Sequence, residues 1–305
     1  AGGGTAGGPL STTIDRIEYN NDTVTASVRN PMSVGRNLFF GTGNQNFGYF
    51  AGGSTPSTVS SVERKEYSNS TVTTVGNLTT NRMRHGATGN ADFGYFAGGR
   101  NPSLSPSQYM SSVDRIDYAN DGVTSLAKGP LSAAKYYVTA TGNQNFGYFA
   151  GGKNPSSSPS VFSTVDRIDY SNDTATASTK GPLSAVRYRN AGFSSREYAL
   201  PTPSTVNYAV GTLATPNTGY FGGGFAGPSV KSGVDRIDYS NDTATAAPKG
   251  PLSVARMKMA AIGSADFGYF AGGETPSRVS TVDRIDYSND TATASVRGPL
   301  GDTPE

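Results

Sequence analysis

The stretch DRIDYSNDTATA occurs three times without change, and it belongs to a longer repeat that covers almost all of the 305 residues. An acidic residue followed by arginine marks each repeat, at Asp15, Glu63, Asp114, Asp166, Asp235 and Asp283. Successive pairs are 48, 51, 52, 69 and 48 residues apart. A regular period of this length predicts a repeat architecture, in which each unit buries its faces against its neighbours.

The last repeat contains four short strand candidates, at 258–263, 267–271, 280–287 and 291–297. Gly-Ser-Ala-Asp separates the first two and Ser-Asn-Asp the last two, and Asn and Asp suit turns because they tolerate positive φ. One four-stranded sheet is too small to cover both of its faces, so the units must pack side by side. The pattern predicts an all-β fold, a β-propeller of four-stranded antiparallel blades, with six blades expected and seven as the alternative.

The repeat boundaries divide the chain, 1–305, as a single propeller domain. We expect a partial blade at 1–31 and full blades at about 36–79, 82–130, 135–182, 187–251 and 256–300. Small residues such as Ala260 and Ala261 favour the innermost position for the first strand of each blade. Six outer hairpins are present, but the first lacks two inner strands. We therefore expect a segment of a longer protein, which an intact mass of 31.6 kDa would contradict.

The composition argues against several classes of function. Basic and acidic residues nearly balance, 25 against 23, so neither nucleic acid nor an acidic membrane surface is an expected partner. The absence of cysteine excludes disulfides, thiol nucleophiles and thiolate metal sites. No apolar run approaches the roughly 20 residues of a membrane-spanning helix, so we expect no membrane insertion.

The repeats resemble kelch-type propeller repeats. The resemblance rests on the double glycine after the second strand, the SVER of Ser61 to Arg64 and the PLSxAR before each first strand. The tryptophan usual in that family is absent here, so we expect Tyr, Val and Thr to pack between the blades.

The sequence FGYFAGG…STVDRIDYSNDTATAS more specifically resembles tandem repeats in virion structural and tail-associated proteins of marine cyanophages. This resemblance implies a virion component that acts in assembly or host-surface attachment. It implies other virion proteins, or a host-surface glycan or protein, as partners, and it allows a homo-oligomer within a larger assembly. The alternative is a secreted or cell-surface bacterial carbohydrate-binding propeller.

The repeated charges have a structural interpretation. The alternation of a strand places Arg115 and Asp117 on one side and Asp114 on the other. Charges between blades must be paired, so we expect Arg115 to pair with Asp117 or with an acid of a neighbouring blade. The interpretation as structural inter-blade charges covers Asp114, Arg115, Asp117, Asp166, Arg167, Asp235, Arg236, Asp283 and Arg284.

Catalytic chemistry has little support in the sequence. His85 is the only histidine, and without a cysteine, a second histidine or clustered carboxylates it suggests a structural residue rather than a base or a ligand. A glycoside hydrolase that uses carboxylates is the least favoured hypothesis, because near-identical acids in every blade indicate structure. We therefore expect no enzyme, no cofactor and no metal site.

Function is best sought where the repeats differ. The segments 100–113 and 153–165, between the second and third strands, are longer than the matching nine residues 54–62 and 274–282. We predict a binding site on these loops, formed by Arg100, Tyr109, Met110, Lys153 and Phe162. An insertion at 194–218 lies between a first and a second strand, so it offers a site on the opposite face.

Overall fold

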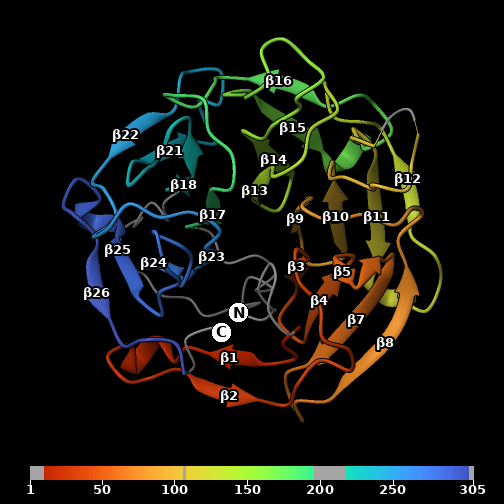
Figure 1. Ribbon diagram of the computed structural model, residues 1–305, viewed down its shortest axis with the longest axis horizontal. Coiled ribbons are helices and arrows are strands. Elements are labelled where there is room, and N and C mark those ends of the chain that lie inside the picture. Colours follow the sequence, from red (N-terminus) through yellow and green to blue (C-terminus); the bar gives the residue numbers. More distant parts are fainter. Residues whose placement is uncertain (1–9, 106–107, 196–216, 302–305) are drawn as a thin grey trace, which may run out of the picture.

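The computed structural model describes residues 10–105, 108–195 and 217–301, which form four-stranded antiparallel sheets around a central axis (Figure 1). Blade 1 contains β3 (Phe40–Gly43), β4 (Phe47–Ala51), β7 (Ser61–Glu66) and β8 (Val72–Asn77). Blade 2 contains β9 (Gly86–Gly89), β10 (Phe93–Ala97), β11 (Val113–Asp117) and β12 (Leu126–Lys128). Blade 3 contains β13 (Thr139–Gly142), β14 (Phe146–Ala150), β15 (Val165–Asp169) and β16 (Ser178–Lys180).

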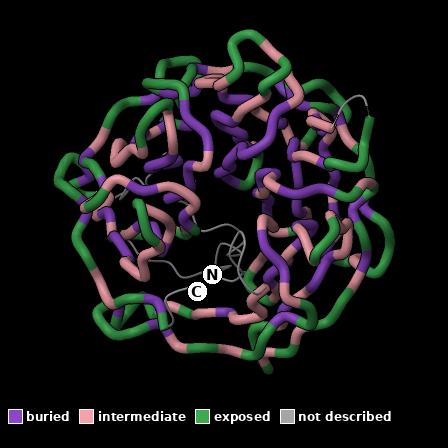
Figure 2. The backbone as a smooth tube through the Cα atoms, in the orientation of Figure 1, coloured by how far each residue is buried: buried purple, intermediate pink, exposed green. Residues whose placement is uncertain are grey.

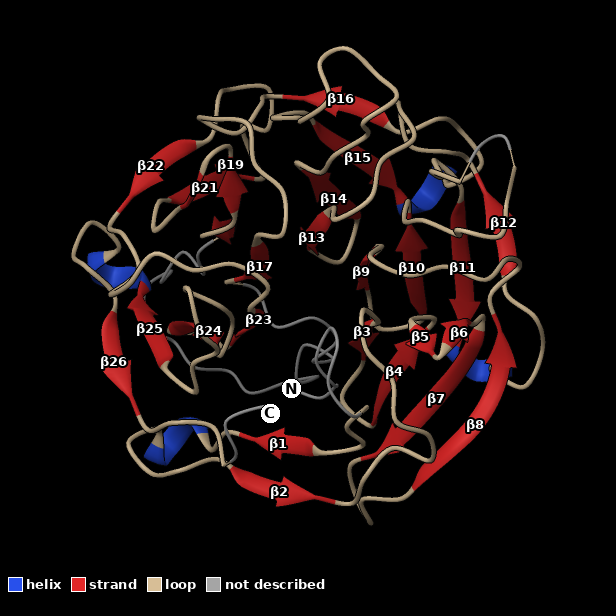
Figure 3. Cartoon of the chain, in the orientation of Figure 1, coloured by secondary structure: helices blue, strands red, loops and turns tan. Residues whose placement is uncertain are grey.

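Blade 4 contains β17 (Ala191–Ser194), β18 (Thr218–Gly222), β21 (Val234–Asp238) and β22 (Ala247–Lys249). Blade 5 contains β23 (Ala260–Gly263), β24 (Phe267–Ala271), β25 (Val282–Asp286) and β26 (Ser295–Arg297). Two small hairpins decorate blades 1 and 4, formed by β5 (Ser54–Thr55) with β6 (Ser57–Thr58) and by β19 (Phe225–Ala226) with β20 (Ser229–Val230). Short 3-10 helices lie toward the periphery (Figure 3), namely η1 (Tyr19–Asn21), η2 (Tyr118–Asn120), η3 (Tyr170–Asn172) and η4 (Tyr287–Asn289).

The described residues form five four-stranded blades, so the expected count of six or seven is wrong. The sixth acidic-Arg hairpin is the two-stranded sheet of β1 (Ile14–Arg16) and β2 (Ser27–Arg29), which lies between blade 5 and blade 1 (Figure 1). The count failed because it took each outer hairpin as the sign of a blade, whereas β1 pairs only with β2 among the described strands. No helix of the described residues is long and apolar enough to cross a membrane.

The first strand of each blade is innermost, as predicted. β3 contacts β9, β9 contacts β13, β13 contacts β17, and β17 contacts β23, while the later strands follow outward in sequence order. Figure 2 shows buried residues along the inner strands and between blades, with exposed residues at the outer turns. The double glycine that ends the second strand has positive φ in every blade, for example 69° at Gly98 and 102° at Gly99, which explains the need for glycine there.

Tyrosine rings fill the space between neighbouring blades. Tyr95 of β10 is fully buried and stacks on Tyr170 of blade 3, with 4.6 Å between the ring centroids. Equivalent stacked pairs recur around the ring: Tyr49 with Tyr118, Tyr148 with Tyr239, Tyr220 with Tyr287, and Tyr269 with Tyr19. Tyrosine thus packs the blades in a chain that has no tryptophan.

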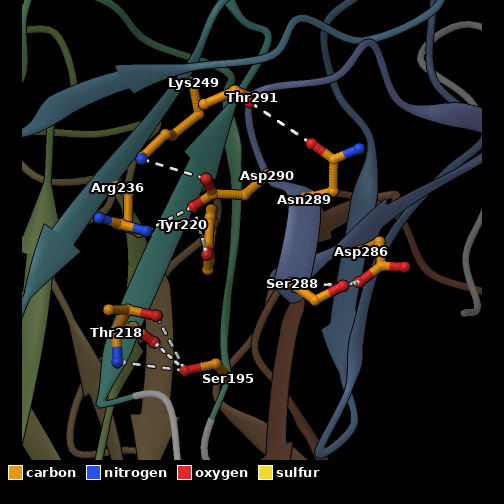
Figure 4. A network of polar contacts seen from close by, with 10 residues as sticks. All are labelled: Ser195, Thr218, Tyr220, Arg236, Lys249, Asp286, Ser288, Asn289, Asp290 and Thr291. Atoms are coloured by element: carbon orange, nitrogen blue, oxygen red, sulfur yellow. Dashed lines mark hydrogen bonds and ion pairs between the residues drawn. The ribbon is translucent and has the colours of Figure 1, made fainter.

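An aspartate at the outer turn of blades 2 to 5, and at the turn of β1–β2, joins its sheet to the preceding blade. Asp290 accepts hydrogen bonds from the hydroxyl of Tyr220 (2.9 Å) and from Arg236 (2.6 Å), and it pairs with Lys249 (3.1 Å) (Figure 4). Tyr220 and Arg236 lie opposite each other in the antiparallel register of β18 and β21, so their side chains reach the same side. We call this arrangement the inter-blade clamp. Its other aspartates are Asp121, Asp173, Asp242 and Asp22.

A second repeated contact fixes the entry to each blade. Asp114 of β11 is fully buried and pairs with the fully buried Arg82, at 3.0 Å, while the hydroxyl of Thr79 donates a hydrogen bond to its other oxygen. Arg82 also donates to the carbonyls of Gly98 and Ser112, at the ends of β10 and before β11. We call this contact the anchoring pair. The other blades contain Arg36–Glu63, Lys135–Asp166, Arg187–Asp235 and Arg256–Asp283.

These contacts give the repeated charges their roles. Arg115 pairs with Asp173 of blade 3, at 2.8 Å, so the acid of a neighbouring blade is its partner rather than Asp117. Asp117 instead accepts a hydrogen bond from the backbone N–H of Ala119 and caps η2. Arg167, Arg236 and Arg284 make the same clamp contact as Arg115, with Asp242, Asp290 and Asp22.

Candidate binding site around the axis

Directly after each anchoring Arg or Lys, two residues differ from blade to blade. They are Asn37-Leu38, Met83-Arg84, Tyr136-Tyr137, Tyr188-Arg189 and Met257-Lys258. The second residue of every pair has a positive φ between 56° and 60°, an uncommon conformation for residues other than glycine. The chain turns here from the connection between blades into the innermost strand.

Backbone hydrogen bonds link these second residues across the blades. Arg84 N–H donates to the carbonyl of Leu38 (2.8 Å), Tyr137 N–H to Arg84 (2.7 Å), and Lys258 N–H to Arg189 (2.9 Å). We call the five residues Leu38, Arg84, Tyr137, Arg189 and Lys258 the axial ring, because each one precedes an innermost strand. They lie on the face that carries the connections from second to third strands, since those connections and the entries to first strands share one end of a four-stranded meander.

Aromatic side chains form a continuous cluster beside the axial ring. Tyr136, Tyr137 and Tyr188 are buried, and Tyr109, Val161 and Phe225 pack against them. The ring centroids of Tyr109 and Tyr136 are 5.2 Å apart, those of Tyr136 and Tyr137 4.8 Å, and those of Tyr188 and Phe225 5.6 Å. This aromatic cluster spans blades 2, 3 and 4, so no single repeat contains it.

Cations lie over these rings. The guanidinium carbons of Arg84 and Arg189 are 4.7 and 4.6 Å from the centroid of Tyr137, and the ammonium of Lys153 is 5.1 Å from that of Tyr188. Arg189 also donates a hydrogen bond to the hydroxyl of Tyr137, at 3.1 Å. Such contacts are electrostatically favourable, because the face of an aromatic ring is negative.

Arg100 is the fourth cation of this region. It forms an isolated bridge with Met83, the neighbour of Arg84, and its Nε donates to Gln108 at 2.6 Å. Burial lowers the pKa of Arg84, with Arg100 and Arg189 acting in the same direction and Tyr137 against it. Within 10–105, 108–195 and 217–301, Arg84, Arg100, Lys153 and Arg189 make no ion pair with a carboxylate.

The predicted loop residues are divided between this site and its surroundings. Arg100, Tyr109 and Lys153 belong to it, as described above. Met110 is buried, with 8 % of its surface exposed, and its backbone N–H donates to Gly99 at 3.0 Å. Phe162 lies near the ammonium of Lys135, 5.8 Å from the ring centroid.

The two aromatic residues that the sequence suggested as a pair have different neighbours. Val161, rather than Phe162, packs against the aromatic cluster, because adjacent residues of an extended segment point to opposite sides. No ring contact joins Tyr109 to Phe162 in the described part of the chain. Most of the insertion at 194–218 lies outside the described residues.

Sequence reasoning missed several residues of the site, namely Arg84, Tyr136, Tyr137, Tyr188, Arg189 and Phe225. It took the PLSxAR before each first strand as a repeated pattern and sought differences between the repeats in the long loops and the insertion. The signal was the pair of letters that follows: NL, MR, YY, YR and MK. These positions vary inside a stretch that is otherwise repeated, which is the criterion that selected the long loops.

His85 lies directly before β9, beside the axial ring but beneath the surface. It is fully buried, with the rings of Phe40 and Phe96 at 5.6 and 5.8 Å from its own. Neither ring nitrogen has a hydrogen-bond partner among the described residues. Burial lowers the pKa of His85 well below its usual value, and the nearby charge of Arg82 lowers it further. No group of histidines and carboxylates within the described ranges could hold a metal ion.

The aromatic cluster and its four cations offer ring faces and positively charged donors within one small area. No carboxylate or histidine belongs to this set. The arrangement is therefore suited to holding a ligand by stacking and by charge-assisted hydrogen bonds.

Comparison with known proteins supports the fold alone. No family model matches the sequence, and no curated protein matches it. A solved structure described as "Structure of YjhT" is similar in fold, with a TM-score of 0.68 over 96 % of this chain and 99 % of that chain. The two sequences are 11 % identical, so the similarity extends to the architecture and no further.

Proposed function

We propose that this chain is a non-enzymatic, kelch-like binding propeller of a phage particle, acting in assembly or host-surface attachment. The similarity of its repeats to those of cyanophage virion proteins supports the phage context. The binding surface is the aromatic cluster with its four cations. The observation that carries the proposal is that the variable residues gather around the axis, on one face of an otherwise repeated scaffold.

A rigid scaffold with variable positions on one face is a common way to build a binding site. Here the clamps and anchoring pairs hold the blades, so the residues of the axial ring are free to differ without loss of the fold. Tyrosine and arginine are also the side chains that most often dominate binding energy at interfaces. The surface contains both, at positions where blades 1 and 5 have other residues.

A host-surface glycan is the partner we favour, and another virion protein is the alternative. An aromatic ring can stack on the apolar face of a sugar, while cations donate hydrogen bonds to its oxygens. A secreted or cell-surface bacterial carbohydrate-binding propeller would use the same surface. Mass spectrometry of purified virions distinguishes these two locations.

Glycan-array binding of wild type and Tyr109→Ala tests the surface. We expect the substitution to weaken binding by about 2 kcal/mol, as for an aromatic anchor at an interface. Leu126→Ala is the matched control, because Leu126 is 54 % exposed on β12, at the outer edge of blade 2. Equal binding by wild type and a normally melting Tyr109→Ala would contradict the proposal. Release of cleaved sugar from a bound glycan would contradict its non-enzymatic part.

A further inference from the structure

We infer that Arg84, Arg100, Lys153 and Arg189 form an anion-recognition site, and that its ligand is an acidic glycan, a saccharide that carries carboxylate groups. This inference rests on the proposed binding function and names its ligand class. The observation behind it is that four cations meet on one aromatic cluster without an acid from the described chain.

The anchoring cations beside this site are paired with carboxylates. Arg82, two residues before Arg84, is fully buried against Asp114, and Lys135, directly before Tyr136, is fully buried against Asp166. Arg82 therefore has a carboxylate partner, on the third strand of its blade, whereas Arg84 has none among the described residues. Arg189 likewise has no carboxylate partner among the described residues, although Arg187, two residues before it, pairs with Asp235 at 3.0 Å.

The cations also come close enough to disfavour one another. Arg84 and Arg189 share the ring of Tyr137, at 4.7 and 4.6 Å, and the charges of Arg100 and Arg189 both lower the pKa of Arg84. Arg84 donates no side-chain hydrogen bond within the described ranges, although a guanidinium has five N–H donors. An anion from outside would satisfy those donors and relieve the repulsion between like charges.

The limits of the site are visible in the axial ring itself. Lys258, its residue from blade 5, forms an ion pair with Glu274 at 2.6 Å, so its charge is already matched. Leu38, from blade 1, has no charge. The unmatched cations therefore lie over blades 2 to 4, the same blades that supply the aromatic cluster.

Ring faces and cations together favour an acidic sugar over other anions. Tyr109 and Phe225, at the two ends of the cluster, are partly exposed, and an aromatic face suits a sugar ring. Guanidinium groups bind carboxylates through two parallel hydrogen bonds. A nucleic acid would need a longer positive track, and the net charge of the chain is only +2. An acidic peptide would use the cations and leave the rings without a matching partner.

Binding to oligogalacturonate and alginate oligosaccharides, each compared with its carboxyl-reduced neutral counterpart, tests the inference. We expect the carboxylated forms to bind at least about tenfold more tightly, since hydrogen bonds to charged groups are worth about 1.5–3 kcal/mol and 1.4 kcal/mol corresponds to a factor of ten. Arg84→Gln combined with Arg189→Gln should remove that preference. Arg84→Lys should retain part of it, because lysine keeps the charge without the planar fork.

Arg16→Gln is the matched control, because the side chain of Arg16 is about half exposed on β1 and its one ion pair among the described residues is with Glu18. It should bind like wild type, and thermal melting should show that all variants are folded. If carboxylated and neutral glycans bind equally, and Tyr109→Ala abolishes the binding of both, the inference is wrong and the proposed function stands. Failure of every glycan to bind, or tighter binding of poly-glutamate than of any glycan, would also overturn it.

Discussion

The inter-blade clamp and the axial ring both occur once per blade, but they differ in how strictly their residues repeat. The clamp uses Tyr and Arg from one blade and Asp from the next at all five joints where it occurs. The axial ring holds Leu, Arg, Tyr, Arg and Lys at five positions with nearly the same backbone φ. Residues that hold neighbouring blades are repeated, whereas residues that face the axis are free to specialise.

The joint between β1–β2 and blade 1 is the one place between neighbouring described sheets where the clamp does not occur. Ser70 of blade 1 occupies the outer turn, where the next four blades have the clamp aspartate. Lys65 contacts the carbonyls of Asn30 and Ser70 there, at 3.4 and 3.0 Å. β1–β2 offers no second strand from which a tyrosine could reach this turn among the described residues. The clamp aspartate is therefore replaced where the described residues include no clamp tyrosine for it to bind.

Breaking an anchoring pair should have the largest effect on stability. Asp114→Asn leaves the charge of Arg82 fully buried without a carboxylate, so we expect a loss of about 3–5 kcal/mol in the free energy of unfolding. Urea denaturation measures the loss. Asp117→Asn, on the same strand, is the control, because Asn and Asp cap a helix about equally well and the change should cost less than about 1 kcal/mol. Similar losses in both variants would show that the stability does not depend on the buried ion pair of Asp114 with Arg82.

Removing the clamp that closes the ring should come next. Asp22 joins Tyr269 and Arg284 of blade 5 to the turn of β1–β2, at 2.9 and 2.8 Å. Asp22→Asn weakens hydrogen bonds to a charged group, so we expect a loss of about 1.5–3 kcal/mol by urea denaturation. Arg16→Gln, which removes only a surface contact of the same sheet, should change the free energy by less than about 1 kcal/mol. An unaffected Asp22→Asn would mean that the ring closes through other contacts.

A pH dependence should come from His85, which belongs to the packed interior and not to the binding surface. Its pKa is lowered in the folded state, so the unfolded chain binds the proton more tightly. The contribution of His85 to stability is full above pH 6.5, the usual pKa of histidine, and falls as the pH decreases below it. The loss approaches about 1.4 kcal/mol per pH unit.

His85→Phe tests this, since Phe39 occupies the equivalent position of blade 1. The difference in unfolding free energy between wild type and this variant should widen in favour of the variant from pH 7.5 to pH 5. Parallel curves for the two proteins would show that His85 is not the group responsible.

The smallest effect on stability should come from the axial ring. Arg84→Gln removes a cation–π contact worth about 0.5–1 kcal/mol and also relieves repulsion from two cations, so we expect a net change below about 1 kcal/mol. The same variant also tests whether Arg84 contributes less to stability than Arg82, the anchoring residue two positions before it. A melting curve that shows a loss above about 2 kcal/mol, typical of a residue that holds the fold, would place Arg84 with the scaffold instead.

The sequence by itself determined the repeating unit, because short strands and turns depend on neighbouring residues. The second strand of the last repeat was predicted at 267–271, and β24 spans those residues. The fourth was predicted from 291, but β26 begins at Ser295, because η4 and the turn after it use the intervening residues. Loop length likewise led to Arg100, Tyr109 and Lys153, since an insertion is visible without knowledge of the fold.

The tertiary structure alone decided how many hairpins become blades and which residues meet at the axis. Asp22 contacts Tyr269, 247 positions away, and no local pattern contains that pairing. Arg84, Tyr137 and Arg189 come from three blades and share a site only because the innermost strands converge. Their side chains are ordinary within their own repeats. Proximity gives them a common chemistry, because charges and rings act over a few ångströms of space and not along the chain.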